Sequence, residues 1–122
     1  MSAAREDPRP QVFTDKRPWG AFEQYTLNEP STVKTITVEP GHRLSLQTHT
    51  QRDELWTVLD SEALVDIGGR SWQAQPGEKV WIPRGTPHRL ANPGSSPVRI
   101  LEVAFGTFDE ADIVRLSDDY PR

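Results

Sequence analysis

Cysteine is absent from all 122 residues of the chain. This absence excludes disulfides, thiolate metal ligands and thiol nucleophiles, so any metal ion would have to be bound by nitrogen and oxygen atoms. Long apolar runs are also missing, because no stretch approaches the ~20 apolar residues that cross a bilayer. The first ten residues, "MSAAREDPRP", lack the apolar core of a signal peptide. These absences predict a cytoplasmic protein without a membrane partner.

Basic clusters are scarce as well. The chain has 14 lysines and arginines against 18 aspartates and glutamates, for a net charge of −4. Binding to a phosphate backbone needs clustered cationic side chains, so nucleic acid is not the expected partner. The length fits one domain that buries roughly two thirds of its surface.

Short strands dominate what is present, and each is followed by a turn-forming sequence such as "EPGH", "IGGR" or "NPGSSP". This spacing predicts an all-β sandwich or barrel. Only "DEADIVRL", residues 109–116, has a pattern suited to a helical turn. Residues 1–12, rich in proline and charge, are predicted to form a flexible arm before a single domain at 13–122. The candidate strands are residues 21–27, 32–38, 43–49, 54–60, 62–68, 70–75, 79–84, 88–93 and 98–106.

A polar cluster occupies the run "LSLQTHTQRDELW", residues 44–56. Alternation along a strand places Gln47 and His49 on one face, and it places Glu54 on the same face as Trp56. If the short turn "TQRD" joins the two strands, the three polar groups converge on one interior. Trp56 is then expected to line a pocket. The alternative is that Glu54 belongs to a surface cluster of charges with its two neighbours.

A fourth ligand is expected from "GEKVWIPRGTPHRLANPG", where His88 follows a Pro/Gly turn at the start of a strand. Two imidazoles with carboxylate and carbonyl oxygens would suit Zn²⁺, Mn²⁺, Co²⁺, Ni²⁺ or Fe²⁺ better than Ca²⁺. Each of these residues alone is more often an ordinary polar side chain, and the combination is what indicates a metal site. His42, beside the "PGH" turn, is expected to be an exposed or rim residue.

These two segments resemble the paired motifs of the cupin superfamily. Gly41 to Glu54 matches the first motif, with Gln47 where the first histidine usually stands, and Gly77 to Asn92 matches the second in full. The resemblance implies a double-stranded β-helix, a jelly-roll-like antiparallel barrel that is often dimeric and holds a metal ion inside. The apolar strand faces also favour a homodimer, since they would be exposed on a lone barrel. They carry Leu44, Leu46, Leu55 and Leu59.

The stretches "KRPWGAFE", "RDELW", "IPRGTPHRLANPG" and "DIVRLSDDYPR" are similar to the type II mannose-6-phosphate isomerase family, over nearly all the chain from Lys16 onward. That family includes the C-terminal domain of bifunctional isomerase/mannose-1-phosphate guanylyltransferases. The resemblance implies interconversion of mannose-6-phosphate and fructose-6-phosphate, or of a related aldose and ketose. It implies catalytic roles for Arg52 and Glu54. The implied metal ligands are Gln47, His49, Glu54 and His88, and the implied sugar-phosphate contacts are Arg52, Arg115 and Arg122.

The chain also departs from the family pattern. Thr50, Gln51 and Leu55 stand where relatives often carry histidine, and Pro121 precedes the last arginine. The group that moves the proton stays open among a metal-bound hydroxide, another carboxylate and His42. Two other functions remain as alternatives: a non-catalytic sugar-binding cupin, and a metal-dependent cupin oxygenase or decarboxylase.

Overall fold

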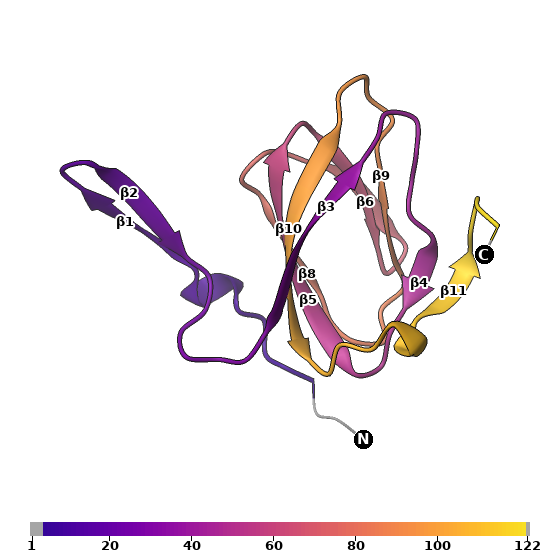
Figure 1. Ribbon diagram of the computed structural model, residues 1–122, viewed down its shortest axis with the longest axis horizontal. Coiled ribbons are helices and arrows are strands. Elements are labelled where there is room, and N and C mark those ends of the chain that lie inside the picture. Colours follow the sequence, from indigo (N-terminus) through magenta and orange to yellow (C-terminus); the bar gives the residue numbers. More distant parts are fainter. Residues whose placement is uncertain (1–3, 122) are drawn as a thin grey trace.

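A computed structural model describes residues 4–121, and regular structure in this part of the chain is almost entirely β (Figure 1). Helical structure within it is limited to two short 3-10 turns, η1 and η2. The elements are η1 (Arg9–Gln11), β1 (Phe13–Arg17), β2 (Gly20–Gln24), β3 (Thr32–Val38), β4 (Leu46–Thr48), β5 (Arg52–Asp60), β6 (Ala63–Ile67), β7 (Arg70–Ala74), β8 (Lys79–Ile82), β9 (His88–Ala91), β10 (Val98–Gly106), η2 (Glu110–Asp112) and β11 (Val114–Ser117). No helix among the described residues has the length and apolar character needed to cross a bilayer.

Two antiparallel sheets face each other to form the barrel (Figure 1). One has the strand order β3-β10-β5-β8, and the other has the order β11-β4-β9-β6-β7. A separate two-stranded sheet, β1-β2, projects from the barrel on the side away from β11. The prediction of an all-β fold, a double-stranded β-helix that forms a jelly-roll-like antiparallel barrel, is confirmed.

Two strands were not predicted, and both lie near the ends of the chain. β1 pairs with β2 along its whole length, from Phe13 opposite Gln24 to Arg17 opposite Gly20. The segment expected to form a helical turn contains η2 but continues as β11, where Val114 pairs with Thr48 of β4. A ladder partner supplied by the fold outweighs the weak local preference for helix.

The space between the sheets is divided into an apolar half and a polar half. The apolar half is a cluster of buried side chains from both sheets, and it includes Trp56, Ile82, Leu90 and Ile100. Leu44 packs against this cluster from the chain before β4. Trp56 also borders the polar half, so one buried indole separates the core from the candidate site.

A second, smaller core lies on the outer face of the β3-β10-β5-β8 sheet. Leu55, Trp81, Val103 and Phe105 are buried there, with Val12 and Tyr25 packed against them. The expectation that Leu55 would be exposed on a lone barrel is therefore wrong, because the chain before β1 and after β2 covers it.

The N-terminal segment makes specific contacts on this outer face. Arg5 lies over the Phe105 ring at 4.3 Å and forms an ion pair with Glu29 at 2.5 Å. The Arg5 backbone N–H donates to Asp53 at 3.1 Å, and Pro8 is buried. The division of the chain into an arm at 1–12 and a domain at 13–122 stays a prediction.

Candidate metal centre

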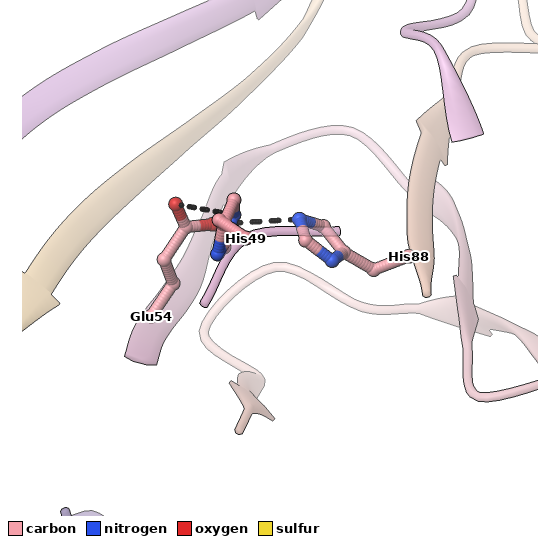
Figure 2. A group of neighbouring side chains, drawn as sticks. All are labelled: His49, Glu54 and His88. Carbon is pink, nitrogen blue, oxygen red and sulfur yellow. Dashed lines mark ion pairs between the residues drawn. The ribbon is translucent and has the colours of Figure 1, made fainter. Parts of the chain in front are cut away.

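Three strands of the barrel bring His49, Glu54 and His88 together in its polar half (Figure 2). His49 follows β4, Glu54 lies on β5, and His88 begins β9. Glu54 Oε2 lies 3.1 Å from His49 Nε2, and Glu54 Oε1 lies 3.7 Å from His88 Nε2. All three side chains are almost completely buried. Buried charges of this kind are normally paired or bound to a metal ion.

The outer nitrogens of both imidazoles face backbone carbonyls. His88 Nδ1 lies 2.9 Å from the Thr86 carbonyl oxygen, and His49 Nδ1 lies 3.4 Å from that of Arg52. An Nδ1–H that donates outward leaves the Nε2 lone pair directed at the centre, which is the usual arrangement of histidine ligands. Burial lowers the pKa of His88, which favours the neutral imidazole that a metal requires.

The donor set fits a divalent metal ion. The ligating atoms of the triad all lie within 4.8 Å of one another. Metal–ligand bonds of about 2.0–2.2 Å require donor atoms roughly 3–4 Å apart, so a small contraction would complete the coordination. Gln47 lines the same cavity, and it pairs with His88 across β4 and β9, which puts the two side chains on one face of the sheet. These four residues could hold the metal ion.

Neighbouring side chains keep Glu54 ionised. Burial by itself would raise its pKa, but the hydrogen bond and electrostatic interaction with His49, with further contributions from His88 and Arg52, lower the pKa of Glu54 to about 2. Arg52 Nε donates to Glu54 Oε2 at 3.0 Å, and the same guanidinium lies over the Phe108 ring at 4.1 Å. Arg52 therefore fixes the carboxylate within the triad.

His49 and Glu54 of the triad line a cavity of about 250 Å³, and three cationic side chains line it as well. Lys34 comes from β3, Arg52 from β5 and Arg115 from β11. Arg115 is paired with Gln47 in the β11–β4 ladder, so β11 brings it to the ligand strand. A cavity lined by candidate metal ligands and by cations can bind a polar, anionic small molecule.

Glu102, which sequence reasoning missed, is a buried acid in the same cavity. Its Oε1 accepts from Trp56 Nε1 at 3.2 Å, and that indole also donates to Glu54 at 3.2 Å. Among the described residues, Glu102 Oε2 has no hydrogen-bond partner, and Lys34 Nζ lies 3.6 Å away. Burial and the neighbouring Glu54 carboxylate raise the pKa of Glu102 to about 8. Strand alternation could have identified Glu102 from the sequence. It lies two residues from Ile100 and from Ala104, which face inward, so its side chain faces inward as well.

Lys34 was missed for a similar reason. It lies in step with Ile36 and Val38 on β3, so alternation directs it into the barrel, where an apolar residue is expected. Its Nζ lies 4.3 Å from the Phe108 ring centroid, on a ring that Arg52 also contacts.

Other predicted residues lie away from the cavity. His42 Nδ1 lies 2.7 Å from the Tyr120 hydroxyl, and the two rings stack outside the barrel, so His42 is not placed to move a proton in the site. Thr50 and Gln51 hydrogen-bond to Asp112, and Leu55 is in the outer core. None of these three residues lines the cavity. Arg122 lies outside the described residues.

The fold and its buried His/Glu/His triad define a cupin. The fold is similar to that of a solved structure from Klebsiella pneumoniae subsp. pneumoniae MGH 78578, an uncharacterised conserved protein with a double-stranded β-helix domain. The two superimpose with a TM-score of 0.62 at 23% sequence identity, over 70% of this chain and 73% of that one. The sequence model of the mannose-6-phosphate isomerase C-terminal family matches residues 6–118. The chain belongs to this family of sugar-phosphate metabolism.

Its relatives are longer proteins. The chain is 42% identical over 107 residues to xanthan biosynthesis protein XanB of Xanthomonas campestris pv. campestris (strain B100), covering 87% of this chain and 23% of XanB. It is 41% identical to mannose-1-phosphate guanylyltransferase ManC of Salmonella typhimurium (strain LT2), covering 87% of this chain and 22% of ManC. The similarity thus spans less than a quarter of each relative.

Proposed function

We propose that this chain is a metal-dependent isomerase that interconverts mannose-6-phosphate and fructose-6-phosphate, or a related aldose and ketose phosphate. The observation that carries the proposal is the joint content of one cavity. Candidate nitrogen and oxygen ligands and three cationic side chains line the same cavity. The family membership supports the same reaction class.

The proposed ligands are Gln47, His49, Glu54 and His88. Their mixed donor set is borderline and would accept Zn²⁺, Mn²⁺, Co²⁺, Ni²⁺ or Fe²⁺. When bound, such an ion would polarise the oxygens at C1 and C2 of the sugar and stabilise the negative charge that develops during isomerisation. Arg52 orients Glu54 for this role through its 3.0 Å hydrogen bond.

The cations on the cavity wall are proposed to hold the phosphate. Arg115 offers a planar guanidinium suited to bidentate phosphate contact, and Arg122 is proposed to add a second from the end of the chain. Lys34 adds a compact ammonium on the opposite sheet. Fixing the phosphate and the metal-bound end together would orient the sugar between them.

The proposal is tested by stripping the purified chain of metal, restoring each candidate ion separately, and following hexose-6-phosphate isomerisation. We expect turnover of mannose-6-phosphate to fructose-6-phosphate that requires the metal. Full metal occupancy with sugar-phosphate binding but no turnover would instead support the non-catalytic cupin. Oxygen uptake or release of carbon dioxide from a small acid would support an oxygenase or decarboxylase.

Lys34→Met is expected to raise the KM for a hexose-6-phosphate about tenfold, with a smaller change in kcat. A charge-assisted hydrogen bond to phosphate would be lost, and such bonds contribute about 1.5–3 kcal/mol. Steady-state kinetics measure the effect. Lys79→Met is the matched control, because Lys79 pairs with Glu23 away from the cavity. An unchanged KM in Lys34→Met would remove Lys34 from the phosphate site.

A further inference from the structure

Glu102 combines deep burial with a free hydrogen-bond acceptor. The residue is 3% exposed and lines the cavity. Its Oε1 accepts from Trp56 Nε1 at 3.2 Å, whereas its Oε2 is, among residues 4–121, the only buried side-chain nitrogen or oxygen without a hydrogen-bond partner. Buried polar atoms in native proteins are nearly always hydrogen-bonded, because an unpartnered one costs free energy. An exception on the wall of a cavity therefore indicates a contact with a ligand.

Neighbouring strands fix the position of this carboxyl group. In the strand register, Glu102 on β10 pairs with Lys34 on β3 and with Trp56 on β5. The three side chains form a row across adjacent strands, and all of them line the cavity. The indole holds Oε1, and Oε2 lies 3.6 Å from Lys34 Nζ, so the free oxygen is kept among cavity-lining groups. An acceptor held in place by its neighbours can discriminate between ligands.

The surroundings of Glu102 select the kind of group that it would contact. The cations Lys34, Arg52 and Arg115 line the same cavity and would repel an ammonium group on a ligand. A phosphate has no donor for a carboxylate and would be repelled by its charge. A hydroxyl fits best, because it can donate to the carboxylate and can also accept from the protonated acid.

Glu102 also lies between the two ends of the site. The Trp56 indole that donates to Glu102 also donates to Glu54 Oε1 at 3.2 Å, which puts Glu102 next to a proposed metal ligand. Lys34, on the other side of Glu102, is a proposed contact of the phosphate. A hexose phosphate held at both ends would bring the middle of its carbon chain, C3 and C4, past Glu102.

We propose that Glu102 is a specificity-determining residue whose Oε2 forms a hydrogen bond with the C3 or C4 hydroxyl of a hexose phosphate in this cavity. The inference rests on the proposed function for the identity of the ligand. A ligand without that hydroxyl would leave a buried acid unpaired, and a site of this kind rejects such ligands strongly. The cations bind any phosphate, so Glu102 would select among the sugars that carry one.

Calorimetric titration with a ligand that cannot react tests the proposal. The hexitol phosphate made by reducing C1 of mannose-6-phosphate keeps the C3 and C4 hydroxyls and cannot isomerise. We expect Glu102→Met to weaken its binding to the Zn²⁺-loaded chain about tenfold, the usual effect of losing one buried hydrogen bond. Either the 3-deoxy or the 4-deoxy analogue should bind the unsubstituted chain about tenfold more weakly, and Glu102→Met should not weaken its binding further. The 2-deoxy analogue should still lose about tenfold in the variant.

Two further variants keep the result interpretable. Glu110→Met removes an acid that lines the same cavity but has a side chain that is 68% exposed, and it should change the affinity for every analogue by a common factor. Glu102→Gln keeps a polar group of the same shape and should give the pattern of Glu102→Met with a smaller loss.

The outcomes separate this inference from the proposed function. Equal weakening of every analogue by Glu102→Met, coupling to the C2 hydroxyl alone, or no weakening would overturn the role of Glu102. Binding of the hexitol phosphate without turnover of mannose-6-phosphate would contradict the isomerase alone, because the titration requires no reaction. Failure of the unsubstituted chain to bind the hexitol phosphate would overturn both.

Discussion

Replacing His88 with alanine is expected to weaken divalent metal binding by more than about 100-fold, since loss of a partner that only orients a ligand already costs 10–100-fold. The imidazole Nε2 faces the shared centre at 3.7 Å from Glu54, and its Nδ1 is held by the Thr86 carbonyl. Few other side chains could replace this donor, because the site is buried within the barrel. Calorimetric titration of the metal-free chain with Zn²⁺ or Mn²⁺ measures the loss.

The chain supplies its own control for this experiment. His42 is a third histidine, and it stacks on Tyr120 outside the cavity. His42→Ala should therefore bind metal as the unsubstituted chain does. Trp56 packs edge to face on His88, at 5.7 Å between ring centroids, so circular dichroism must confirm that His88→Ala remains folded. Equal metal affinity in the two variants would refute the assignment of His88 as a ligand.

Asp53→Ala should cost about 3–5 kcal/mol in free energy of unfolding, the usual effect of breaking a buried ion pair. The Asp53 side chain is fully buried. Its Oδ1 accepts the Arg84 backbone N–H at 2.8 Å, and its Oδ2 accepts Arg84 Nη2 at 2.6 Å and the Arg5 backbone N–H at 3.1 Å. Removing this carboxylate would loosen both the turn before β9 and the N-terminal segment. Urea unfolding followed by fluorescence measures the change.

Asp60→Ala is the matched substitution for comparison. Asp60 also pairs with an arginine, Arg99, at 2.6 Å, but its side chain is 54% exposed. An exposed pair of this kind contributes less than about 1 kcal/mol. If both variants unfold at the same urea concentration, Asp53 does not have the structural role inferred from its burial.

Asp53 and Glu54 illustrate what strand alternation could and could not predict. Alternation correctly put Glu54 on the face of Trp56, inside the barrel. The competing interpretation of a surface charge cluster is wrong for both acids and for Arg52, because all three are buried. Asp53 lies on the outer face of the sheet, where the N-terminal segment covers it. No local pattern in the sequence predicts this long-range contact.

Motif spacing predicted the position of the triad because its residues lie at fixed distances from turns. His88 follows the turn containing Gly85, and Gln47 and His49 share a strand phase. Lys34 and Glu102 belong to no turn and to no motif. Each is one polar residue in an apolar strand, and only the pairing of β10 with β3 and β5 brings them beside the ligands. Long-range pairing of this kind cannot be read from local pattern.

The terminal strands were missed for related reasons. β1 is polar on one face and projects from the barrel, so it lacks the apolar alternation that marks a half-buried strand. β11 is exposed throughout and owes its extended form to β4. In both cases a neighbouring strand, and not burial, defines the element.

β11 contributes to the cavity but not to the packing of the barrel. Among the described residues, neither apolar core includes any residue of this strand, yet it places Arg115 in the cavity wall. Substitutions in Val114–Ser117 can therefore alter which molecules enter while the barrel keeps its packing. Divergence in ligand preference would be least costly there, and libraries that aim to change which ligand the cavity binds should vary this strand first.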